Sequence, residues 1–286
     1  MGKRILQPLE FNANQQDPPA AGYVRFYNDL TGGRAGLHTI RASHRASVLQ
    51  NHVGRNRVVI ATARGDVTTI DSQGAIFTTV GTIGGLVAVA TDPSGGFVQG
   101  MRRVGLEAAS SSSAVAGVYA NTAQWTRGDA AGKGGFYMAF RWAPGIGQAS
   151  TTRGFCGVTS LTSALTDAEP STQTDVFGMG WDTADTKIQL MHREGSGTVQ
   201  KYAMSFDKPS ATDGDAYQFE IYAPPNGSSV SWRLQRLSDG AFDFDTYSSA
   251  IPAQGTFLAP RIGMSVAGVT GDIGLRFMNF YGESDH

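Results

Sequence analysis

The fold is decided by residues 135–144, whose sequence is GFYMAFRWAP. Phe136, Met138, Phe140 and Trp142 occupy alternate positions, and a tyrosine, an alanine and an arginine lie between them. Successive side chains of a strand point to opposite faces, so the four large residues share one face. The stretch therefore predicts a β-strand with one apolar row.

The same alternation recurs six times between residues 177 and 277. The further apolar rows are Phe177, Met179 and Trp181; Ile188 and Leu190; Tyr217, Phe219 and Ile221; Val230, Trp232 and Leu234; Ile262, Met264 and Val266; and Ile273, Leu275 and Phe277. Turn-forming sequences such as Asp239-Gly240 separate them. Seven one-sided strands need a second sheet to cover their apolar faces, which predicts a mainly β protein with a C-terminal β-sandwich.

The first third of the chain is less regular. Residues 1–21 contain three prolines and predict an extended arm. Leu37, Ile40, His44 and Val48 are spaced like one face of a helix, so a short helix is expected over 37–53. Short β-branched runs between residues 57 and 107 predict strands that form either a small sheet or a trimeric β-prism. Three regions result: an arm at 1–21, a β-rich connecting and trimerisation region at 22–107, and the sandwich at 108–286.

Composition limits the classes of partner. Residues 1–107 carry 11 Lys/Arg and 7 Asp/Glu, a net +4, and residues 108–286 carry 12 and 17, a net −5. These small, dispersed charges predict no nucleic-acid partner. Cys156 is the single cysteine, which excludes an intrachain disulfide and a zinc site based on several cysteines. The absence of an 18-residue apolar run and of a hydrophobic leader predicts a soluble protein without membrane insertion or secretion signal.

Pairs of carboxylates are the candidate catalytic or calcium-binding groups. They are Asp167/Glu169, Asp182/Asp185, Asp213/Asp215 and Asp243/Asp245. Two acids flanking a sugar bond would suit glycoside cleavage, and oxygen-rich loops would suit calcium. Aspartates also gather in turns for local hydrogen bonds, so we expect no catalytic residue, no metal and no cofactor. His38, His44 and His52 are read as ordinary polar residues, with an axial ring of one of them in a trimer as the alternative.

Aromatic side chains are the candidate ligand contacts, because a ring can stack on the apolar face of a sugar. Trp181 and Trp232 fall on apolar rows and are expected in the core. Trp125, Tyr222 and Tyr247 lie in irregular or turn-rich stretches, so these three are the predicted ligand-binding residues.

Several short segments resemble fibre proteins of tailed bacteriophages. The front segment is Pro18-Pro19-Ala20-Ala21-Gly22-Tyr23-Val24-Arg25-Phe26-Tyr27. The back segments are Trp125-Thr126-Arg127-Gly128, Gly134-Gly135-Phe136, Glu169-Pro170-Ser171-Thr172, Tyr222-Ala223-Pro224-Pro225-Asn226 and Phe280-Tyr281-Gly282-Glu283-Ser284-Asp285. They resemble the tail-fibre or receptor-binding family with a lectin-like C-terminal sandwich of the jelly-roll or concanavalin-like kind.

That resemblance implies a homotrimer displayed on the virion and made in the host cytoplasm. It implies that the N-terminal arm docks on tail or baseplate proteins and that the sandwich attaches the particle to a bacterial surface glycan or protein receptor. It implies no catalytic residue. Two alternatives remain open: a structural virion protein of the baseplate, head fibre or capsid surface, and a polysaccharide-degrading spike.

Overall fold

The computed structural model describes the strands within residues 24–48 and the residues 57–64, 69–83, 97–130, 134–145, 151–209, 215–268 and 270–284. The predicted arm at 1–21 lies outside the described residues, as do His44 and His52. Among the described residues, no helix has both the length and the apolarity needed to cross a membrane.

The N-terminal strands form a small antiparallel sheet of their own. They are β1 (Val24–Thr31), β2 (Arg34–Arg41) and β3 (Ala46–Val48), in the order β1-β2-β3. The predicted helix over 37–53 is therefore wrong, because its first part is β2 and a later part is β3. The register pairs Thr31 with Arg34 and leaves only Gly32-Gly33 between the strands, a sequence typical of two-residue hairpin connections. The backbone pairing of β1 with β2 therefore determines the structure here, although a few apolar residues are spaced as in a helix.

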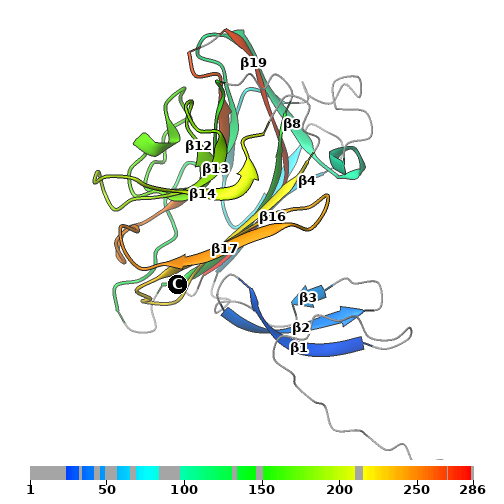
Figure 1. Ribbon diagram of the computed structural model, residues 1–286, viewed down its shortest axis with the longest axis vertical. Coiled ribbons are helices and arrows are strands. Elements are labelled where there is room, and N and C mark those ends of the chain that lie inside the picture. The colour runs from blue at the N-terminus through cyan, green and yellow to red at the C-terminus, as the bar shows by residue number, and fades with distance from the viewer. Residues whose placement is uncertain are drawn as a thin grey trace, which may run out of the picture.

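The remaining strands build two antiparallel sheets, which face one another as a sandwich (Figure 1). The larger sheet has nine strands, and its main path runs β17-β16-β15-β10-β19-β4-β5. Its members along this path are β17 (Phe242–Tyr247), β16 (Val230–Arg236), β15 (Tyr217–Ala223), β10 (Phe136–Pro144), β19 (Gly271–Ser284), β4 (Arg57–Ala63) and β5 (Ile70–Gln73). Two further strands, β8 (Val104–Ser111) and β7 (Thr82–Ile83), extend it beside β19.

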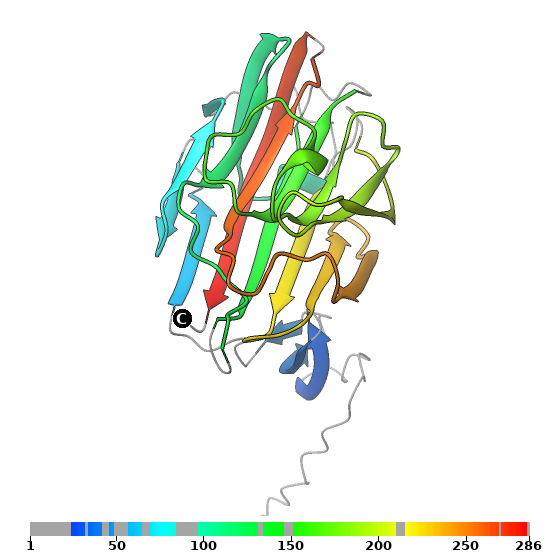
Figure 2. The same cartoon turned by 90° about the vertical axis from the view of Figure 1, so that its left-hand side faces the viewer.

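The smaller sheet has seven strands in the order β14-β13-β12-β11-β18-β9-β6. They are β14 (Gln200–Asp207), β13 (Lys187–His192), β12 (Phe177–Trp181), β11 (Arg153–Thr159), β18 (Ala259–Ser265), β9 (Val115–Ala120) and β6 (Phe77–Val80). Two short 3-10 helices, η2 (Phe97–Gly100) and η3 (Pro170–Thr172), complete the regular structure of the described residues. Figure 2 shows η3 in front of the strands, on the segment that crosses this sheet.

Strand β19 organises the larger sheet, and it corrects the domain boundary. It pairs with β10 from Leu275 to Ser284, with β8 over its first half and with β4 over its second half. Strand β6 joins the smaller sheet by pairing with β9. Strands from residues 57–107 therefore belong to both sheets, so the sandwich begins at Arg57 and not at Ala108.

The core confirms the alternation seen in the sequence. Phe136, Phe219 and Phe277 are each at most 1% exposed, and the rows to which they belong face the other sheet. Trp142 on β10 stacks on Trp181 of β12, with ring centroids 6.1 Å apart and planes 14° from parallel. Each buried aromatic of this kind contributes about 2–3 kcal/mol of transfer free energy. The expected burial of Trp181 and Trp232 is confirmed.

Candidate functional site

Trp125 lies in the core and not on a binding surface. Its side chain is 1% exposed and meets Phe136 and Phe280 edge-on, with centroids 6.5 and 6.4 Å apart. Arg57 lies over the ring at 5.7 Å. Trp125 lies outside the named strands, but its backbone forms an isolated antiparallel β-bridge with Leu258. The prediction of Trp125 as a sugar-stacking residue is therefore wrong, because neither ring face reaches solvent.

Tyr222 and Tyr247 lie on opposite faces of the nine-stranded sheet. Tyr222 on β15 is opposite Ser231, which in turn is opposite Thr246, so alternation turns Tyr247 to the other side. Tyr222 packs beside Tyr137 on the outer face and is 8% exposed. The three predicted residues thus do not form one site.

Tyr247 instead belongs to an aromatic cluster where the two sheets meet. Its ring centroid lies 4.7 Å from that of Tyr202 and 4.6 Å from that of His192. Tyr202 and His192 stack nearly parallel, with an interplanar angle of 6°. Tyr202 is 43% exposed and Tyr247 is half-buried, whereas His192 is fully buried beneath them. We call Tyr202 and Tyr247 the edge platform.

The edge platform spans both layers of the sandwich. Tyr202 is on β14, the terminal strand of the smaller sheet, and Tyr247 is on β17, the terminal strand of the larger one (Figure 1). The two strands are joined by Ser205, whose backbone N–H and Oγ both donate to Oδ2 of Asp243, at 2.6 and 2.8 Å. This clasp and the buried ring below fix the relative position of the two tyrosines.

His192 supports the platform from the end of β13. Its Nδ1 lies 3.0 Å from the carbonyl oxygen of Ala250, and its buried Nε2 has no hydrogen-bond partner among the described residues. Burial lowers the pKa of His192, and the contact with the Ala250 carbonyl opposes this shift without cancelling it. A neutral imidazole is therefore the form that fits between the two tyrosines.

A carboxylate lies next to the platform. Asp245 is exposed and lies on the same face of β17 as Tyr247, and it accepts a hydrogen bond from the Thr246 amide at 2.7 Å. Partial burial, together with the charge of Asp245 and a hydrogen bond to it, raises the pKa of Tyr247 to about 12. The tyrosine hydroxyl therefore stays protonated beside the carboxylate.

Sequence reasoning missed Tyr202. It continues the row of Met204 and Phe206 on β14, and both of those residues are 5% exposed. No strand was predicted here from the sequence, so this row was not recognised. Tyr202 is exposed because it stands near the start of a terminal strand, and the order of strands in a sheet is set by pairing between distant segments.

The first two carboxylate pairs are held by cations. Arg153 contacts Asp167 at 2.8 Å and Glu169 at 3.1 Å, and Lys201 contacts Asp182 at 3.1 Å and Asp185 at 2.5 Å. Partial burial alone would raise the pKa of Asp167 and of Asp182, but hydrogen bonds and the neighbouring cation lower the pKa of both. A general acid needs the opposite shift, so these two aspartates serve as loop anchors.

The other two pairs have different surroundings. Asp213 lies outside the described residues, and Asp215 is 3.7 Å from Arg236. Asp243 forms the clasp to Ser205, and Asp245 borders the platform. Within the described part of the chain, no group of three or more His, Cys, Asp or Glu residues is placed to hold a metal ion.

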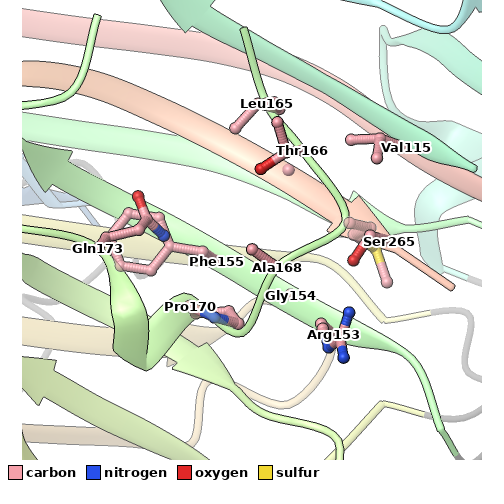
Figure 3. A pocket seen from close by; sticks show the side chains of 12 residues that line it. Val115, Arg153, Gly154, Phe155, Leu165, Thr166, Ala168, Pro170, Gln173 and Ser265 are labelled. Atoms are coloured by element: carbon pink, nitrogen blue, oxygen red, sulfur yellow. The ribbon is translucent and has the colours of Figure 1, made fainter. Parts of the chain in front are cut away.

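A small pocket lies on the outer face of the seven-stranded sheet, under the segment that carries η3 (Figure 3). Arg153 and Phe155 from β11, Ser265 from β18 and Gln173 from the crossing segment contribute to its walls. Its volume of about 40 Å³ has room for about three water molecules. A sugar ring with its hydroxyls is several times larger, so the pocket is unsuitable for a saccharide.

Comparison with known proteins gives similarity of structure only. No protein-family model and no curated protein sequence matches this chain. The lectin UEA-II complexed with galactose aligns with a TM-score of 0.47 and 12% identity, over 81% of this chain and 99% of the lectin. Peanut lectin with a nine-residue peptide aligns at 0.45 and 10%, over 80% and 97%. A variant of the family 7 alginate lyase A1-II' in complex with product aligns at 0.42 and 11%, over 79% and 94%. With two antiparallel sheets packed face to face, this chain is a mainly β protein with a β-sandwich fold.

Proposed function

We propose that the sandwich is a carbohydrate-binding module and that the edge platform is its contact with the glycan. The observation that carries the proposal is the 43% exposure of Tyr202 on a ring that packs against Tyr247 and His192. A large aromatic side chain gains little by remaining in water, whereas its face suits the apolar face of a sugar. The Asp245 carboxylate beside it is an acceptor for sugar hydroxyls, which gives the contact an orientation.

The platform is built in advance of binding. His192 is buried beneath both tyrosines, and the hydrogen bonds from Ser205 to Asp243 hold the two strands together. The rings therefore lose little conformational freedom when a ligand arrives, which keeps the entropic cost of binding low. A single shallow platform gives weak binding, and several copies engaged together give firm adhesion.

We further propose that the chain is a fibre protein of a tailed bacteriophage and attaches the virion to a bacterial surface glycan as a homotrimer. The support is the resemblance of its front and back segments to that family, together with a sandwich that offers an exposed aromatic contact. Three platforms on one trimer, multiplied over several fibres, would make attachment strong while each contact stays reversible.

The binding proposal is tested by titrating the full chain with a panel of neutral, amino and acidic oligosaccharides in a calorimeter. Tyr202→Ala should raise the Kd for a bound glycan by roughly threefold to tenfold, the equivalent of one aromatic contact. Phe244→Ala is the matched control, because this phenylalanine is 70% exposed on the other face of β17. Equal affinities of wild type and Tyr202→Ala for every bound glycan would refute the proposal that the edge platform binds the glycan.

The attachment proposal is tested on bacteria that the virus infects. Labelled full-length protein should stain the cells and slow adsorption of the virus, and Tyr202→Ala should do both less well. Failure of the wild-type protein to stain or compete would favour a structural virion protein. Shortening of the surface polysaccharide during incubation would instead indicate a degrading spike. Native mass measurement should give three copies per particle.

A further inference from the structure

We infer that the edge platform selects neutral or amino-bearing glycans and disfavours glycans that carry carboxylates. The inference rests on the proposed function and names the ligand class of the same site. It follows from which charges share the face of the platform and which are turned away from it.

Two carboxylates lie on the face of β17 that carries Tyr247. The register places Asp243, Asp245 and Tyr247 opposite Leu234, Trp232 and Val230, so all three point to the inner side at the end of the sheet. Asp245 is exposed and its charge contributes to the raised pKa of Tyr247, and Asp243 accepts hydrogen bonds from Ser205 of β14. The two carboxylates therefore give the platform a negatively charged border on the side of β17.

Two cations close in sequence to Tyr202 and His192 are held by other groups. Lys201 precedes Tyr202, and alternation puts it on the other face of β14, where Asp182 and Asp185 hold its ammonium. Arg193 follows His192, and its Nη2 donates to the carbonyl oxygens of Thr172 and Gln173. Neither charge is available to a carboxylate bound on the rings.

Two further cations, on β16 and β13, also point away from the platform or are held by a carboxylate. Arg233 is opposite Phe244, on the outer face of the sheet, and lies over the ring of Phe242 at 4.8 Å. Lys187, towards the other end of β13, contacts Asp207 at 3.2 Å. A uronate stacked on Tyr202 would therefore meet the charges of Asp243 and Asp245 with no described cation directed at it.

The expected discrimination is moderate and depends on salt. Two like charges about 4 Å apart and fully exposed to water repel enough to weaken binding by roughly fivefold to tenfold, and salt at about 1 M screens most of this effect. An ammonium group on the sugar should gain from the same carboxylates. The order of affinity at low salt is thus amino sugar, neutral sugar, uronate.

The test uses oligosaccharides of glucose, galactose and mannose, each as the neutral, 2-amino and uronate form, titrated into the full chain at low and high salt. The uronate form of a bound sugar should be roughly fivefold to tenfold weaker than its neutral form at low salt and nearly equal to it at high salt. Asp245→Asn should reduce the difference at low salt, whereas Phe244→Ala should leave it unchanged.

The outcomes separate the inference from the proposed function. Uronates that bind as tightly as neutral sugars would overturn the inferred charge selection. If Tyr202→Ala still weakens binding in that case, the proposed role of the platform in glycan binding is kept. A discrimination that survives Asp245→Asn unchanged would also overturn the charge selection. If no member of the panel binds, the carbohydrate-binding proposal fails and the inference fails with it.

Discussion

Replacement of Trp125 by alanine separates a core role from a ligand-binding role. The ring is 1% exposed between Phe136 and Phe280, so its removal opens a cavity that the two sheets cannot close completely. Truncation of a buried tryptophan costs about 3–5 kcal/mol of unfolding free energy. With about 4 kcal/mol lost and a urea slope of about 3 kcal/mol per molar, the unfolding midpoint should fall by about 1.3 M.

The assay is urea denaturation followed by tryptophan fluorescence and circular dichroism on the full chain. Phe244→Ala, which removes an exposed ring, should change stability by about 0.5 kcal/mol or less. Gly282→Ala should destabilise as well, because its new Cβ would lie 2.7 Å from Cη2 of Trp125. A Trp125→Ala protein with the wild-type midpoint and no glycan binding would refute the core assignment and restore the residue as a ligand contact.

Two further predictions concern ionisable groups. Lys201→Met should lower the unfolding free energy by about 2 kcal/mol at neutral pH, since it leaves two partly buried aspartates without their cation. Because the pKa of Asp182 is lowered in the folded wild type, the deficit, measured by urea denaturation, should shrink as the pH falls and Asp182 becomes protonated; a deficit independent of pH would contradict the ion-pair explanation. For His192, whose pKa burial lowers, the unfolded chain takes up a proton more readily than the folded one, so stability should fall as the pH drops below about 6.5. His192→Phe keeps a ring under the platform and should flatten this part of the thermal-stability profile, and an unchanged profile would show that another group is responsible.

The sequence predicted the core rows because a strand buried on one face imposes a period of two. Phe136, Phe219 and Phe277 are buried for this reason, whatever their neighbours in the sheet. It did not predict that β4 pairs with the distant β19, and that pairing moves the start of the sandwich to Arg57. Nor did it predict a strand over β14 (Gln200–Asp207), so Tyr202 was not among the candidate residues. Strand order depends on contacts between distant segments, and one sequence contains no direct measure of them.

The back segments that resemble phage fibre proteins contribute to the scaffold and not to the platform. Arg127 donates to the carbonyl oxygens of Pro252 and Gly227, and Gln254 donates to Asn226, so three loops are tied together at one end of the sandwich. Glu169 similarly anchors the segment that crosses the smaller sheet by accepting from Thr183.

Tyr202, Tyr247 and Asp245 lie outside every one of those motifs. A fold held by such loop contacts can therefore keep its architecture while the side chains on the ends of β14 and β17 change, and under the proposed function specificity follows those side chains. Exchanging residues 200–203 and 245–247 between two proteins of this scaffold should accordingly transfer glycan preference without loss of stability. A chimera that folds but keeps its original preference would place the recognition site elsewhere on the sandwich.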